Sequence, residues 1–210
     1  MKKFIYSILA TSVFTSCVSL SVGKYDLELK TASNINNGEK LQTSSLTANN
    51  SMVDVEWTPA DEMLSVKLTN KTNAPIKIHW DEAVFVNVFG ESFGVIHGDI
   101  KFAEKEKAQT YTIVANQSYI KDVVLPKDYV KRSTAGTGWI IEPMLPTKDF
   151  RESDLIQKGK ALIGKTMRLI IPIEFNNTIN NYEFTFVVND FYIVKSNDNK
   201  LELEKKNRVR

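Results

Sequence analysis

The sequence predicts a mainly β fold, an antiparallel β-sandwich with one short helix. Between residues 53 and 194, apolar side chains recur at every second position in one short run after another, as in half-buried strands. Segments rich in Asn, Thr, Gly and Pro separate these runs and are typical of turns. Only residues 154–163 have their apolar side chains at helical spacing. Many short strands joined by turns favour a sandwich.

Each expected strand has one apolar face. The first two place Val53, Val55 and Trp57, then Leu64, Val66 and Leu68, toward the core. A turn at 70–75 follows, because Asn and Thr side chains bond nearby backbone groups and Pro ends strand pairing. Further strands are expected at 76–80, 84–88, 93–96, 111–114, 120–125, 167–175 and 182–188, with a last edge strand at 191–194. Residues 176–181 are expected to form a hairpin loop.

The expected helix runs from Asp154 to Ile163. Ser153 is its expected N-cap and Gly164 its expected stop. Gly159 lies in its middle and costs up to about 1 kcal/mol relative to Ala. We therefore expect a short helix.

The N-terminus has the pattern of a bacterial export-and-anchor signal. Lys2 and Lys3 precede a mainly apolar run, residues 4–14, and two small residues then precede Cys17. Eleven residues are too few to span a bilayer as a helix, which needs roughly 20, so cleavage is expected. The segment 14–17 resembles a lipobox, with Phe14 where Leu is usual. It predicts that residues 1–16 are a lipoprotein signal peptide and that Cys17, the only cysteine, is lipidated. An ordinary signal peptide cut nearby is the alternative.

The expected domain organisation continues with a polar tether over residues 17–51. Twelve of the residues between Thr31 and Ser51 are Ser, Thr or Asn, so this stretch has little apolar surface to bury. The alternation in Tyr25–Lys30 is compatible instead with an edge strand packed on the domain. Residues 52–195 are expected to form the β-sandwich domain, and 196–210 a solvated basic tail.

Composition argues against nucleic-acid binding. Removing residues 1–16 takes two of the 27 basic residues and none of the 25 acidic ones, so the mature chain is formally neutral. Nucleic-acid binding requires a clustered basic face. We expect no cofactor, because phosphate-binding loops and paired metal-type cysteines are missing from the sequence.

Several segments resemble a family of uncharacterised bacterial cell-envelope lipoproteins. They are the runs 70–86 (with Ile76-Lys77-Ile78-His79-Trp80), 95–102 (Val-Ile-His-Gly-Asp-Ile-Lys-Phe), 164–174 and 182–186. The resemblance spans roughly residues 53–194. It implies an immunoglobulin-like antiparallel β-sandwich of the periplasm or outer membrane, and it implies no activity. A Ser-His pair common in that family is replaced here by Ser92-Phe93-Gly94.

Two candidate chemical sites are weak. Gly90-Glu91-Ser92-Phe93-Gly94 matches the G-x-S-x-G motif of hydrolases, in which the serine needs a strand before it and a helix after it. Because the residues after Ser92 have a strand pattern, a turn between two strands is favoured. The two histidines, His79 and His97, could form a zinc or copper site with Asp99 if their strands approached, although histidines satisfied within a sheet are commoner.

An exposed aromatic residue is the remaining candidate. Trp80 follows the inward alternation of its strand and is expected in the core, whereas Trp139 lies between a Gly-rich loop and two prolines and could contact a sugar or peptide. The sequence thus favours a non-enzymatic envelope lipoprotein that is held at the membrane, with the outer membrane expected, through lipid on Cys17 and that binds an envelope protein partner. A carbohydrate- or metal-binding accessory lipoprotein and a hydrolase using Ser92 are the alternatives.

Overall fold

The computed structural model describes residues 21–134, 136 and 138–195. Its strands are β1 (Ser21–Asn34), β2 (Glu39–Lys40), β3 (Gln42–Ser44), β4 (Thr47–Asn49), β5 (Val53–Pro59), β6 (Leu64–Asn70), β7 (Ile76–Ile78), β8 (Val84–Val86), β9 (Ser92–His97), β10 (Thr112–Val114), β11 (Tyr119–Pro126), β12 (Val130–Arg132), β13 (Trp139–Ile141), β14 (Thr166–Phe175) and β15 (Thr178–Lys195). The α-helix is α1 (Glu152–Lys160), and three 3₁₀ turns are η1 (Trp80–Glu82), η2 (Phe102–Glu104) and η3 (Lys127–Tyr129). The predicted mainly β, antiparallel fold with one short helix is confirmed.

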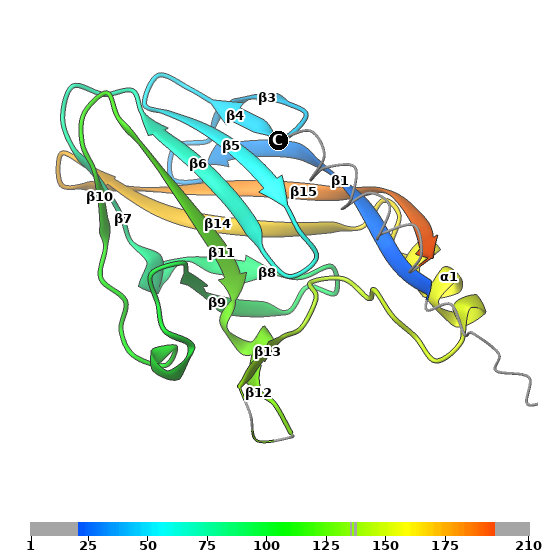
Figure 1. The fold of residues 1–210 in the computed structure, drawn as a ribbon. Helices are drawn as coiled ribbons and strands as arrows, with labels where there is room; N and C mark the ends of the chain where they lie inside the picture. The colour runs from blue at the N-terminus through cyan, green and yellow to red at the C-terminus, as the bar shows by residue number, and fades with distance from the viewer. Residues whose placement is uncertain (1–20, 135, 137, 196–210) are drawn as a thin grey trace, which may run out of the picture.

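Thirteen strands form one antiparallel sheet, and eleven of them follow a path that nearly closes on itself. The order is β2-β1-β15-β14-β8-β9-β11-β6-β5-β4-β3, with β7 beside β14 and β10 beside β7; β12 and β13 form a separate hairpin. The two ends of the path meet, because Leu41 joins β2 to β3 and Leu29 N donates to Ser45 O at 2.9 Å. Figure 1 shows β5, β6 and β11 crossing in front of β14 and β15. The result is a near-barrel in which β9 connects the two facing layers.

The core fills the space between these layers. Inward positions of β5 and β6 (Val53, Val55, Trp57, Leu64, Val66, Leu68) are all 3% exposed or less. Trp57 meets Phe184 and Phe186 of β15 edge-on, with ring centroids 5.0 and 5.5 Å apart. The period-two pattern therefore predicted both the strands and the faces they bury.

The turn after β6 forms by the predicted mechanism. Asn70 Oδ1 accepts a hydrogen bond from Thr72 N at 2.9 Å, and its amide donates to the carbonyls of Ala74, Val114 and Ala115. Asn70 is fully buried. One polar side chain thus closes the turn and ties it to the end of β10.

The structure corrects the prediction that residues 17–51 are a tether. From Ser21 onward this segment forms β1 to β4, and β1 pairs with β15 along almost its whole length, from Ser21↔Lys195 to Asn34↔Tyr182. The polar composition misled because a few apolar side chains are enough to pack the segment on the core: Leu29, Ala32, Leu41 and Ala48 are buried there, and Tyr25, Leu27 and Leu46 pack against this core. The alternative, a strand over Tyr25–Lys30, is confirmed within β1. Residues 17–20 and the predicted tail 196–210 lie outside the described residues.

Three further boundaries differ from prediction. The hairpin turn contains only Asn176 and Asn177, whose φ angles of 49° and 61° suit a tight two-residue turn. The expected last edge strand is the continuation of β15, paired with β1 on one side. The helix begins earlier, so Ser153 lies inside it and Arg151 occupies the N-cap position; Gly164 follows a short turn after its end. Within the described part of the chain, no helix has the length and apolar character needed to cross a membrane.

Candidate binding groove and the buried histidine behind it

A shallow groove of about 840 Å³ lies over the outer face of β5, β6 and β11. Because alternate residues of these strands point to the core, the groove receives the others: Glu56, Thr58, Ser65, Lys67, Tyr119 and Lys121. Its surface is polar and carries charges of both signs. Trp139, the aromatic residue expected to contact a sugar or peptide, does not line it.

Lys67 is the centre of the groove surface. It lies opposite Glu56 on one side and Lys121 on the other. Its Nζ is 2.7 Å from Glu56 Oε1 and 5.4 Å from the centroid of the Tyr119 ring, which is 57% exposed. The hydrogen bond to Glu56 raises the pKa of Lys67. This surface offers donors, acceptors and an aromatic ring, a combination suited to a polar peptide or a sugar.

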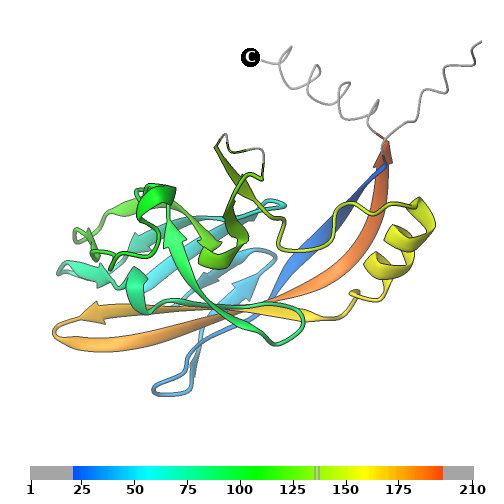
Figure 2. The same cartoon turned by 90° about the horizontal axis from the view of Figure 1, so that it is seen from below.

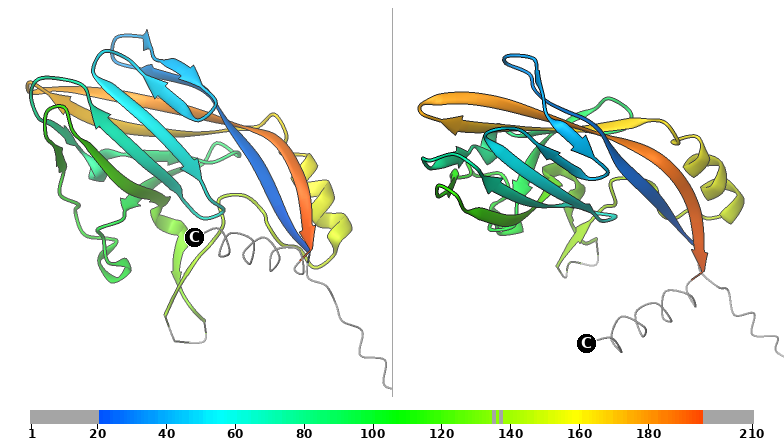
Figure 3. Two further views of the ribbon diagram at one scale, coloured as in Figure 1. Left: turned by 45° about the horizontal axis from the view of Figure 1, so that its top comes forward. Right: turned by 90° about the horizontal axis from the view of Figure 1, so that it is seen from above.

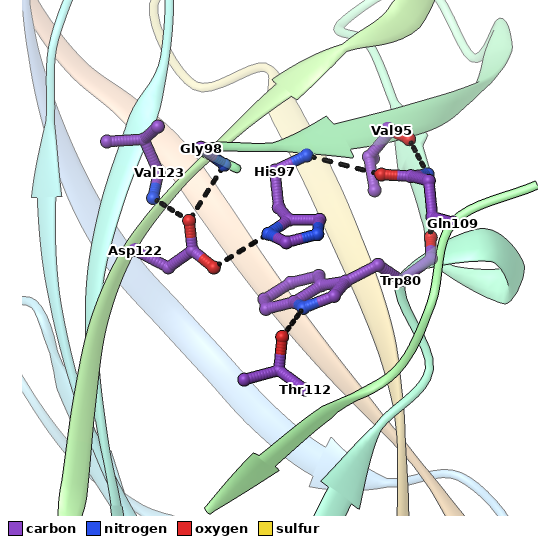
Figure 4. Close-up of polar contacts among 8 residues, drawn as sticks. All are labelled: Trp80, Val95, His97, Gly98, Gln109, Thr112, Asp122 and Val123. Atoms are coloured by element: carbon purple, nitrogen blue, oxygen red, sulfur yellow. Dashed lines mark hydrogen bonds and ion pairs between the residues drawn. The ribbon is translucent and has the colours of Figure 1, made fainter. Parts of the chain in front are cut away.

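Asp122 connects the groove to the protein interior. Its Oδ1 accepts hydrogen bonds from Gly98 N at 2.8 Å and Val123 N at 2.7 Å, and its Oδ2 lies 3.0 Å from His97 Nδ1 (Figure 4). Because an ionised carboxylate only accepts hydrogen bonds, Nδ1 carries the proton. A Cβ on residue 98 would lie 2.9 Å from Oδ1, so glycine permits this close approach.

His97 is held on three sides. It is 4% exposed, and its ring stacks on Trp80 with centroids 5.2 Å apart and an interplanar angle of 15°. Trp80 Nε1 donates to Thr112 Oγ1 at 2.8 Å, and Gln109 Nε2 donates to Val95 O at 2.7 Å (Figure 4). Gln109 Oε1 also accepts a hydrogen bond from His97 N, at 3.4 Å. His97 Nε2 is buried without a hydrogen-bond partner. The arrangement fits a structural histidine that fixes the end of β9.

His79 belongs to a different cluster. Its Nε2 lies 2.9 Å from Glu174 Oε2, and Lys77 Nζ lies 2.9 Å from Glu174 Oε1. These hydrogen bonds, from Lys77 first and then His79, lower the pKa of Glu174, and Glu174 in turn raises the pKa of Lys77. Tyr111 packs beside both His79 and Lys77. Among the residues that the structure describes, no three His, Cys, Asp or Glu side chains gather to share a metal ion. His79, His97 and Asp99 are therefore not brought together; Asp99 lines the groove.

Ser92 opens β9 and is exposed. The turn before it is closed by Gly90 N donating to Asn87 O at 3.0 Å, and β8 and β9 pair across it. The predicted turn between two strands is thus confirmed, and a strand stands where the hydrolase motif requires a helix.

Trp139 is half-buried at the start of β13. Phe102 packs against its edge, and the guanidinium carbon of Arg132 lies 4.5 Å from the indole centroid. It also packs on the small core of Ile96, Leu125 and Val130. Arg132 therefore covers part of the ring that a ligand would use, and Tyr119 is the more accessible aromatic platform.

Sequence reasoning missed Asp122 and Glu174, the partners of the two histidines. A signal existed for Asp122, because it shares the period-two positions of Ile120 and Val124 and so had to be placed near the core. No such signal marked Glu174, whose proximity to His79 depends on the pairing of β7 with β14.

Comparisons with protein-family models, curated proteins and solved structures gave no match.

Proposed function

We propose that the protein is a lipid-anchored lipoprotein of the cell envelope whose β domain is a non-enzymatic interaction module. The observation that supports anchoring most is the order of the leader: two lysines, a short apolar run, small residues and the single Cys17. Lipid on Cys17, with two or three acyl chains, would hold the chain durably. We propose the outer membrane as its location, since no Asp follows the cysteine. We also propose that the domain is related to immunoglobulin-like sandwiches, which its two facing antiparallel layers support.

Anchoring is tested by mass spectrometry of the mature protein and by Cys17→Ser. The mature wild type should begin at Cys17 and carry the mass of its acyl chains, whereas Cys17→Ser should move from the membrane fraction to the soluble fraction. Substituting the exposed Ser92 by Ala is a matched control that should stay with the membrane. An unmodified thiol on the mature chain, or retention of residues 1–16, would contradict the proposal.

The groove over β5, β6 and β11 is the proposed partner surface. Its exposed Tyr119 ring and paired charges suit a polar segment of an envelope protein, and a carbohydrate is the second candidate because the ring is accessible for stacking. A photo-crosslinking residue at position 121 should capture a discrete protein in intact envelopes. The same residue at position 179, on the far hairpin, should not. Equal labelling at both positions would argue against the groove, and binding of glycans alone would favour the second candidate.

A further inference from the structure

Phe150 has a large apolar side chain that is almost fully exposed to solvent. It is 99% exposed, more than any other large hydrophobic residue that the structure describes. Its backbone is nevertheless fixed: Phe150 N donates to Asp149 Oδ1 at 2.7 Å, and Asp149 Oδ2 is bound by Lys158 Nζ of α1 at 2.6 Å. Phe150 is therefore presented to the outside by an ordered segment.

This segment lies beside the start of β1. Gly23 N donates to Thr147 O at 2.8 Å, and Tyr25 Oη donates to Pro146 O at 2.7 Å. Ser21 Oγ donates to the carboxylate of Glu152, the first residue of α1. Figure 2 shows α1 beginning at the end of the molecule where β1 starts and β15 ends, and both views in Figure 3 agree. Ser21, where β1 begins, thus contacts Glu152, which is two residues after Phe150 in the sequence.

Few residues separate Cys17 from the first residue of β1. Cys17 is four residues before Ser21, and fully extended chain spans at most about 3.6 Å per residue, so Ser21 lies within about 14 Å of the acylated residue. A lipid surface that holds Cys17 must therefore lie close to this end of the domain. Within residues 148–160, four basic residues stand against three acidic ones, and two of the acidic ones are paired: Asp149 with Lys158 and Asp154 with Arg151. This segment therefore carries no excess of negative charge.

We propose that Phe150 is a second membrane contact, whose ring enters the lipid interface beside the acylated Cys17 and sets the orientation of the domain. The inference rests on the proposed lipid anchor. Proteins that lie on a membrane surface bury Trp, Phe and Leu side chains at the boundary between headgroups and acyl chains, and neighbouring Lys and Arg side chains extend to the headgroups. A single ring binds too weakly to recruit a protein, but the anchor keeps its local concentration high.

Fluorescence of a tryptophan at position 150 tests this contact. The acylated mature protein carrying Phe150→Trp is reconstituted into phosphatidylcholine–phosphatidylglycerol vesicles that contain brominated lipids. The matched control is Ile35→Trp. Ile35 is 50% exposed and lies just after the other end of β1, about 45 Å from Ser21 along an extended strand at 3.3 Å per residue. The unsubstituted protein supplies the background from its own tryptophans. Quenching should be severalfold stronger at position 150 than at position 35, with a blue-shifted emission.

The outcomes separate this inference from the anchor itself. If mass spectrometry finds no lipid on Cys17, the proposed function fails first. If the cysteine is acylated and the two positions are quenched equally, Phe150 does not touch the membrane and the inference is wrong. If position 150 is shielded from aqueous iodide in native envelopes but not in vesicles, a protein covers it instead, which also overturns the inference.

Discussion

Trp80→Ala is expected to lower the free energy of unfolding by about 3–5 kcal/mol, the range for truncating a large buried aromatic side chain. Trp80 is 0% exposed, stacks on His97 and donates a hydrogen bond to Thr112. It lies in η1, which contacts both β9 and β14. Its removal would leave a cavity and expose a face of the buried imidazole. Urea unfolding, followed by circular dichroism and by fluorescence, measures the loss.

Two controls identify the cause of this loss. Trp80→Phe keeps an aromatic ring against His97 and loses the indole N–H, so it should cost clearly less than Trp80→Ala. Tyr119→Ala removes an exposed ring from the groove and should change stability by no more than about 0.5 kcal/mol. A Trp80→Ala protein as stable as the Tyr119→Ala protein would show that the stacked pair does not hold the two layers together.

The strands were predictable because burial imposes the same period on every one of them. Val53, Val55 and Trp57 had to share a face whatever the topology, and the structure places all three in the core. The topology was not predictable, because strand order depends on contacts between residues far apart in the sequence. The pairing of β1 with β15 joins residues more than 140 positions apart and has no local signature.

The candidate site was harder to predict than the fold for the same reason. The sequence marks His97 as a candidate metal ligand, yet its environment is set by Asp122, Gln109 and Trp80, which three separate segments bring together. The prediction of a tether over residues 17–51 was wrong for a different reason. The short strands β2 and β3 are wholly exposed and are held by backbone pairing with β1 and β4, so the polarity of 31–51 did not exclude regular structure.

Gly159→Ala is expected to destabilise the protein, by about 1–3 kcal/mol, although helix propensity alone favours Ala by up to about 1 kcal/mol. A Cβ at position 159 would lie 2.4–2.5 Å from three carbons of the Phe191 ring. That ring is only 7% exposed, and a Cβ on Gly23 would lie 2.7 Å from it. Two glycines, one in α1 and one in β1, therefore make room for Phe191 at the end of β15. Denaturant unfolding gives the sign of the change.

Gly94→Ala is the matched control, because its Cβ would meet nothing closer than Lys127 Cε at 3.7 Å. It should be neutral or stabilising by a few tenths of a kcal/mol, since Ala loses less backbone entropy on folding. Combining Gly159→Ala with Phe191→Leu should cost less than the sum of the two single changes, because the smaller side chain relieves the contact. If Gly159→Ala alone stabilises the protein, α1 can shift away from β15 without lowering the free energy of unfolding. Close packing against Phe191 would then not explain the glycine at position 159.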